Sequence, residues 1–283
     1  MANITTRADL GNLFNEIIVE AQYTAQETSI MRPLVNMVPV ANAVGNVVQI
    51  PKFGLLDVEG VSPALVEGED LTGSDLTTSL AATITMAERA AMTLLTDDAV
   101  ETMPNYNLAA EIGRILGEQM AERFDLDAMA TFANFKAAND IDASAGLTAD
   151  ILFQAAAKLR MEKARGTMVG VFHPAATYQL KAQLTSAGAA ELGSLSNVGN
   201  SALTSGLVGS IAGITIFEST LVGTSGGVFA LGAIGGAMKR DVRLETERDA
   251  SKRATEIVGS AVWGFAAVKP ENGVSITTVD AIA

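Results

Sequence analysis

A long acidic stretch without a basic residue constrains this chain more than any other feature. No Lys or Arg occurs between Lys52 and Arg89. The interval contains seven carboxylates: Asp57, Glu59, Glu67, Glu69, Asp70, Asp75 and Glu88. It opens with an apolar run at 47–50 and closes with a run at 77–86 that alternates with period two, as half-buried strands do. Compact domains rarely keep so long an irregular connection. The sequence therefore predicts two strands around an acidic segment that is disordered or reaches out to a partner.

The amino-acid composition excludes several classes of protein function. The chain has 283 residues, 48% of them apolar, which is enough for a sizeable core in one or two domains. Its net charge of −13 argues against a nucleic-acid-binding surface, which needs clustered Lys and Arg. The absence of cysteine excludes disulfides and thiolate metal sites and fits a reducing compartment such as a cytoplasm. The N-terminus lacks the basic start and apolar core of a signal peptide. Residues 192–238 carry only one charge, but glycines interrupt every apolar run, so no membrane-spanning segment is expected.

The helical signals lie in the first two thirds of the chain. Residues 7–27 show helical spacing, and the chain leaves that helix by Arg32-Pro33; this arm packs on its own domain or on a neighbouring subunit. A capped turn follows at 96–100. The longest helix is predicted over 107–135, about 43 Å at 1.5 Å per residue. Further helices are predicted between Thr148 and Gly166 and from Pro174 onward, with a strand at 168–172 between them.

The last third is rich in strand signals. Strands are expected near 214–217, 228–234, 242–247, 255–268 and 274–279. The polar residues 248–253 predict a hairpin between the third and fourth of these. Strands before and after a helical middle indicate an α+β chain.

The sequence offers no convincing catalytic or metal site. His173, the single histidine, lies where a strand meets a helix and is interpreted as a capping or packing residue. The run 223–227 matches the pattern of a serine nucleophile at Ser225, but no helix is expected after it and no histidine follows. A glycine hairpin turn explains that run. The adjacent Asp97 and Asp98 are interpreted as helix caps. We expect that the protein is not an enzyme and that it binds no cofactor and no metal.

The densest charge lies at 239–256 and leaves two readings open. The first is a solvated hairpin, in which each exposed ion pair contributes about 0–1 kcal/mol. The second is an inter-subunit contact that uses charge for register. The candidate contact residues are those of the acidic stretch (Asp57, Glu59, Glu67, Glu69, Asp70 and Asp75) and of this hairpin (Arg240, Arg243, Glu245, Glu247, Arg248, Asp249, Lys252 and Arg253).

The order of several short motifs resembles the major capsid proteins of tailed bacteriophages, which share the HK97 fold. These motifs are RPLV (32–35), GNVVQIPKFG (45–54), EGEDL (67–71), LLTDDA (94–99), VFHP (171–174), LVGSIAG (207–213) and RDA (248–250). Each motif is weak alone, whereas their order and spacing are fairly specific.

The resemblance implies a division of the chain and a function. The implied parts are an N-terminal arm at 1–36, a linker at 37–44, an E-loop at 45–90, a peripheral domain with a spine helix at 91–146, an axial domain at 147–238 and the peripheral C-terminal strands at 239–283. The implied function is assembly as pentamers and hexamers into an icosahedral shell around phage DNA. The implied partners are other copies of the chain, portal, scaffolding and possibly cement proteins, and DNA without sequence specificity. The implied location is the virion, assembled in the host cytoplasm.

Two departures from the family pattern and three alternatives accompany this resemblance. Some members crosslink an E-loop lysine to a neighbour's asparagine, but no lysine follows Lys52 here, so no crosslink is expected. Only about 36 residues form the arm, so proteolytic removal of a long leader is not expected either. The alternatives are an encapsulin-type compartment, a surface adhesin and a hydrolase that uses Ser225.

Overall fold

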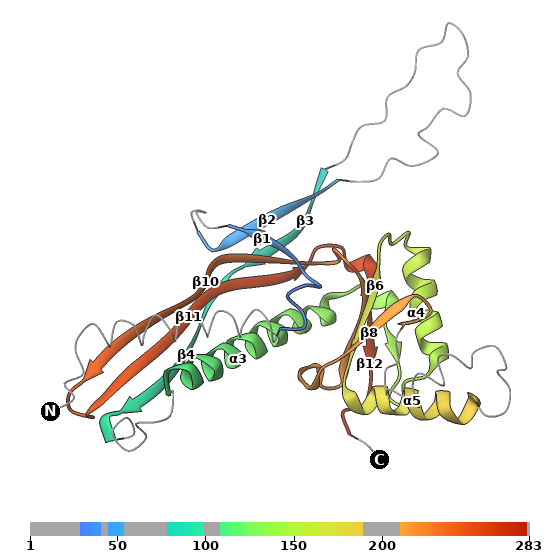
Figure 1. Ribbon diagram of the computed structural model, residues 1–283. Coiled ribbons are helices and arrows are strands. Elements are labelled where there is room, and N and C mark those ends of the chain that lie inside the picture. Colours follow the sequence, from blue (N-terminus) through green and yellow to red (C-terminus); the bar gives the residue numbers. More distant parts are fainter. Residues whose placement is uncertain (1–28, 41–44, 54–77, 99–107, 189–209, 282–283) are drawn as a thin grey trace, which may run out of the picture.

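The computed structural model describes residues 29–40, 45–53, 78–98, 108–188 and 210–281. Figure 1 shows a long strip of strands with one helix alongside it, a second sheet covered by two helices, and a two-stranded hairpin that projects from the strip. None of the described helices is long and apolar enough to cross a membrane. The predicted arm helix at 7–27 and most of the acidic stretch (54–77) lie outside the described residues.

The long strip is a four-stranded sheet in the order β1-β10-β11-β4. Its strands are β1 (Asn36–Pro39), β10 (Ile234–Asp249), β11 (Ala254–Ala267) and β4 (Ala87–Thr96). β10 and β11 form an antiparallel hairpin, β4 extends it on one side, and β1 pairs with β10 in parallel on the other. The predicted linker at 37–44 therefore begins as a strand of the sheet. The predicted polar hairpin at 248–253 is confirmed.

Helix α3 (Leu108–Met129) packs along one face of this sheet. Period-two alternation along β11 directs Ile257, Ala261 and Trp263 toward the helix, where they contact Leu116, Met120 and Phe124. Asp127 accepts hydrogen bonds from Trp263 Nε1 (3.1 Å) and Arg89 Nε (2.9 Å), so a carboxylate on the helix ties it to both β11 and β4.

The predicted helix over 107–135 is too long. α3 ends at Met129, and the chain tightens into the 3₁₀ helix η2 (Ala130–Asn134). The Thr131 hydroxyl donates to the Ala128 carbonyl (2.7 Å), which competes with the regular helical bonding pattern. Twenty-two residues span about 33 Å. The apolar stripe continues past the helix end because Phe132 and Phe135 stack on each other and pack, with tilted rings, against Phe229 of the second sheet.

The second sheet has six strands in the order β5-β12-β9-β6-β8-β7. They are β5 (Ile141–Asp142), β12 (Gly273–Thr277), β9 (Ser225–Ala230), β6 (Met168–Phe172), β8 (Ile214–Glu218) and β7 (Ser210–Ile211). α4 (Ala149–Met161) and α5 (Pro174–Gly188) bury one face around Phe172, Leu152 and Leu180. The other face packs on Phe132 and on Met31, which precedes β1.

Two predicted boundaries in this region are wrong. The single strand expected at 228–234 is two: β9 ends at Ala230, Gly232 turns the chain at φ 91°, and β10 begins at Ile234. α4 ends at Met161 rather than near Gly166, because Lys163 adopts a left-handed conformation (φ 56°) and closes the helix. The last strand, β12, lies in the range 239–283 that the resemblance assigns to the peripheral C-terminal strands. It pairs with β9 and β5 in the second sheet and not with β10 or β11.

The two strands predicted around the acidic stretch are confirmed. β2 (Val47–Phe53) and β3 (Thr78–Thr85) pair antiparallel, from Val47 opposite Thr85 to Phe53 opposite Thr78. At the base of this hairpin Ile84 and Met86 are buried against β10 and β11. The hairpin therefore leaves the body from a packed base (Figure 1). In the sequence, the acidic residues 54–77 lie between the end of β2 and the start of β3.

Candidate subunit interface

The tip of the β10–β11 hairpin is built by ion pairs within the chain. The Arg248 guanidinium donates two hydrogen bonds of 2.7 Å to the two carboxylate oxygens of Asp97, and these bonds lower the pKa of Asp97. Lys252 Nζ bonds Glu256 Oε1 at 2.7 Å. Asp249 accepts hydrogen bonds from the Ser251 hydroxyl (2.6 Å) and amide (2.9 Å), which lower its pKa to about 2. The interpretation of Asp97 as a helix cap missed its pairing with Arg248.

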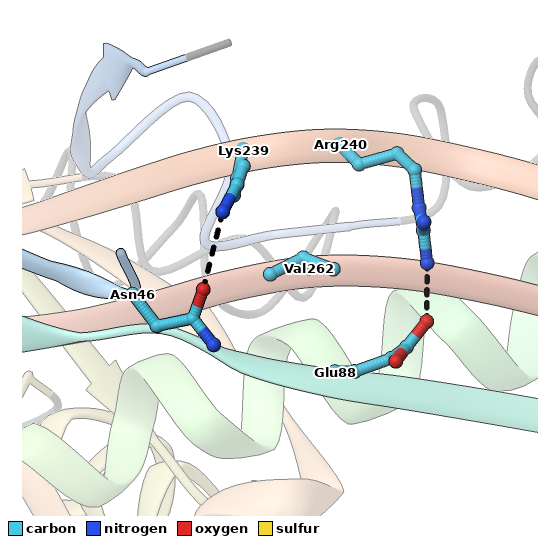
Figure 2. A pocket seen from close by; sticks show the side chains of 5 residues that line it. All are labelled: Asn46, Glu88, Lys239, Arg240 and Val262. Atoms are coloured by element: carbon cyan, nitrogen blue, oxygen red, sulfur yellow. Dashed lines mark hydrogen bonds and ion pairs between the residues drawn. The ribbon is translucent and has the colours of Figure 1, made fainter. Parts of the chain in front are cut away.

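The middle of β10 joins the base of the β2–β3 hairpin to the sheet. Arg240 forms an ion pair with Glu88 of β4 and donates to the Ser260 hydroxyl (3.3 Å). Lys239 Nζ donates to the Gly45 carbonyl (3.1 Å) and to Asn46 Oδ1 (3.2 Å), just before β2. Asn46, Glu88, Lys239, Arg240 and Val262 line an open pocket of about 330 Å³. Figure 2 shows these five side chains. Arg240, predicted as a subunit contact, thus already has partners in its own chain.

The sheet face opposite α3 has an apolar strip along its edge strand, β4, that no other described element covers. Every second residue of β4 points to this face, and its Met92 and Leu94 side chains are 62% and 45% exposed. Met92 lies opposite Val258 of β11, which in turn lies opposite Glu245 of β10. We call this surface the outer sheet face; it consists of Ala90, Met92 and Leu94 of β4, Glu256, Val258 and Ser260 of β11, and Arg243, Glu245 and Glu247 of β10.

Charged residues of β10 lie beside this apolar strip, on the same face of the sheet. Arg243 and Glu245 form an ion pair of 3.2 Å while each side chain remains 60% exposed. Exposed apolar surface rimmed by charge is typical of protein–protein interfaces. Sequence reasoning found the charged residues and missed Met92 and Leu94. The missed signal was the run Met92 to Leu95, which has apolar residues on both faces of one strand.

The remaining predicted contact residues divide into two groups. Arg253 is exposed at the hairpin tip, with φ 49°. The six acidic candidates of the loop lie outside the described residues: Asp57, Glu59, Glu67, Glu69, Asp70 and Asp75.

The structure explains the residues that were weighed for catalysis. His173 Nδ1 accepts a hydrogen bond from the Ala175 amide (3.2 Å) at the start of α5, which confirms the capping role. Ser225 is the first residue of β9 and is followed by strand rather than helix. The predicted glycine hairpin turn is wrong, because β8 and β9 pair with opposite sides of β6 and not with each other. Within the described ranges, no group of three or more His, Asp or Glu residues could bind a metal.

Comparisons with known proteins bear on the fold and the family of this chain. A sequence profile described as phage capsid protein matches residues 80–276. The capsid of the cyanophage P-SCSP1u is similar with a TM-score of 0.68 at 18% identity, covering 89% of each chain. The capsid of Ralstonia phage GP4 is similar with a TM-score of 0.66 at 12% identity, and the match covers 87% of each chain. A virus-like particle from Pyrococcus furiosus is similar with a TM-score of 0.63 at 8% identity, and the match covers 93% of this chain and 98% of that chain. No curated protein matches in a sequence comparison.

The structural similarities confirm the predicted α+β fold of HK97 type. They do not favour a compartment shell over a phage capsid, and the adhesin and hydrolase alternatives find no support among them. The profile covers more than half of the residues, across both sheets and α3. The chain belongs to the phage capsid protein family.

Proposed function

We propose that many copies of this chain assemble as pentamers and hexamers into an icosahedral shell that encloses packaged phage DNA. The observation that carries the proposal is the outer sheet face, with its half-exposed Met92 and Leu94, in a chain of the phage capsid family. Exposed apolar side chains aligned on one face gain free energy when a partner covers them, at roughly 25 cal/mol per Å². A shell subunit requires such faces because each copy contacts several others.

The division of the chain follows the same proposal. Residues 1–36 act as an arm, 45–90 as the extended loop, 91–146 and most of 239–283 as a peripheral domain, and 147–238 as an axial domain. The pairing of β12 with β9 supports assigning 273–277 to the axial sheet instead. The burial of Met31 supports anchoring the end of the arm in its own subunit.

The charged hairpin contributes register more than affinity in this proposal. Arg248, Lys252 and Arg243 each have a carboxylate partner within the chain, so a neighbouring subunit would share or exchange these partners. Exposed pairs of this kind add little net stability, but mispairing like charges is costly. Their arrangement thus favours one alignment of neighbouring subunits over others.

The remaining parts of the proposal concern partners and location. Portal, scaffolding and possibly cement proteins would bind the assembled shell, which forms in the host cytoplasm. Contact with DNA would be weak and without sequence specificity, since a net charge of −13 repels the polyanion. The chain has a structural role and no catalytic one.

Electron microscopy of the purified protein tests the proposal directly. Closed shells are expected, and small discrete particles would count against it. The double variant Met92→Glu/Leu94→Glu should lower shell yield about tenfold, since it places two charges in a desolvated contact. The matched variant Met92→Leu/Leu94→Met keeps the surface apolar and should assemble normally. Normal shells from the Glu variant would remove the outer sheet face from the interface.

A further inference from the structure

The turn after α4 concentrates positive charge in an acidic chain. Residues 158–165, which we call the cationic turn, contain four bases and one acid, whereas the whole chain carries −13. The bases are Lys158, Arg160, Lys163 and Arg165. Among them projects Met161, whose side chain is 81% exposed.

Only part of this charge is explained by local structure. Lys158 Nζ donates to the carbonyls of Asn139 (3.1 Å) and Asp140 (3.0 Å), and Arg160 donates to the Ala212 carbonyl (3.3 Å). Both lie in the last turn of α4, where the helix dipole favours cations. Glu162, the one acid of the turn, is paired with Lys136. Lys163 and Arg165 lie beyond the helix end, are exposed, and form no ion pair within the described residues.

Backbone geometry fixes where Lys163 projects. Its amide bonds the Arg160 carbonyl (3.0 Å) and the next amide, of Ala164, bonds the Leu159 carbonyl (3.0 Å), which closes the helix. Lys163 occupies the left-handed position (φ 56°) that usually takes glycine, because a Cβ is strained there. The turn therefore presents a lysine where a glycine would close the helix at lower cost.

The chain contains one segment of matching chemistry. Residues 54–77 carry six carboxylates and no base, and the cluster Glu67, Glu69 and Asp70 is flanked by Val66 and Leu71. Acids bordered by apolar residues complement cations that surround an exposed methionine. The segment spans the far ends of β2 and β3, and twenty-four residues running out and back can extend up to about 40 Å beyond them.

We propose that the cationic turn of one subunit binds the acidic segment 54–77 of a neighbouring copy. The inference rests on the shell assembly proposed above and specifies one contact within it. Nucleic acid is the less suitable partner, because two unpaired bases neutralise few phosphates and the rest of the chain repels a polyanion. The contact would be salt-dependent, since the cationic side chains are exposed to solvent.

The absence of cysteine allows a direct test. One variant carries a single cysteine at Glu67, Glu69 or Asp70, and a second carries one at Met161, Lys163 or Arg165. The two variants are mixed before assembly and treated with an oxidant or a short bis-maleimide. At least one pair of variants should then give a dimer band on a non-reducing gel. Such a dimer is necessarily intermolecular. A cysteine at Arg114, exposed on α3, replaces the second variant as the control and should give no dimer above background.

The outcomes separate this inference from the proposed function. Shells that form normally but yield no crosslink for any pair would overturn the inference and leave shell assembly standing. Failure of the unmodified chain to form shells would overturn both.

Charge reversal gives an independent test that needs no crosslink. Lys163→Glu/Arg165→Glu should lower shell yield about tenfold, Glu67→Lys/Glu69→Lys should do the same, and the four changes together should restore it. Replacing the cationic half of the combination by Arg114→Glu/Arg123→Glu, at exposed positions of α3, should not restore assembly. If Lys163→Glu/Arg165→Glu shells form at normal yield but lose nucleic acid, the turn contacts nucleic acid and the inference is wrong.

Discussion

Asp125 joins the segment preceding β1 to helix α3. Its side chain is buried and accepts hydrogen bonds from the Ser29 hydroxyl (2.5 Å) and the amides of Ile30 (2.9 Å) and Met31 (3.1 Å). Asp125→Ala leaves three buried donors without an acceptor and should lower the free energy of unfolding by about 3 kcal/mol. Thermal unfolding of the subunit measures the loss. Glu118→Ala, at an exposed position of the same helix, should change the free energy by less than about 0.5 kcal/mol.

Asp125 should also give the subunit a distinctive pH dependence. Burial raises the pKa of its carboxyl in the folded state, so between the unfolded pKa of about 3.9 and the raised value the folded protein binds more protons. The group's stabilising contribution is thus present below the unfolded pKa and is lost as pH rises through the folded one. Urea unfolding at several pH values from about 4 to 7 should show the difference between wild type and Asp125→Asn changing in that direction. A pH-independent difference would contradict the raised pKa.

Gly264 permits the base of the β2–β3 hairpin to lie against β11. A Cβ at this position would lie 2.3 Å from the Thr85 carbonyl oxygen and 3.0 Å from the Met86 Cα, both in backbone. Gly264→Ala should therefore displace the hairpin and destabilise the subunit by about 2 kcal/mol. Gly259→Ala in the same strand is the control, because its Cβ would meet the Leu244 side chain at an ordinary 3.5 Å. Equal melting temperatures for the two variants would show that the close approach is not required.

At the scale of elements, local patterns predicted what local physics decides. Sequence patterns correctly predicted three features: the cap at Thr148, the strand at 168–172 and the helix start at Pro174. Each of them depends on residues only a few positions apart in the sequence. The end of α3 was missed because the phenylalanines after Met129 keep helical spacing while they pack on Phe229, about a hundred residues away in the chain. Local sequence carries no signal for such a distant partner.

The candidate interface was predicted in the same uneven way. The density of charged residues at 239–256 located the β10–β11 hairpin, since a charged residue can be recognised in the sequence without knowing its neighbours in the fold. The outer sheet face required the register between β4 and β11, which aligns Met92 with Val258 from distant parts of the chain. The cationic turn was missed because its helix was predicted to end at Gly166, which placed Lys163 inside a helix.

The β10–β11 hairpin should lose order in acid at its tip first. Hydrogen bonds from Ser251 lower the pKa of Asp249 to about 2, and those from Arg248 lower that of Asp97. A carboxyl whose pKa is lower in the folded state than in the unfolded state stabilises the folded form at pH values above its unfolded-state pKa of about 3.9. That contribution is lost as pH falls through the folded-state pKa. Hydrogen exchange should show the Ser251 amide protected at pH about 4 and exposed near 2. In Asp249→Asn that change should be absent.

At the scale of the whole molecule, the fold permits a shell joined without covalent bonds. An isopeptide bond from the extended loop requires a lysine amine in its outer part. The loop has Lys52 in β2 but no lysine in residues 54–77, so the charged groups of that connection are all carboxylates. Intact particles dissolved in denaturant should therefore give one band near 29.3 kDa on a denaturing gel. The same particles should fall apart more readily as salt rises, because exposed ion pairs are screened over about 10 Å at 0.1 M. A ladder of covalent multimers, or particles indifferent to salt, would show that the loop is secured by something other than its carboxylates.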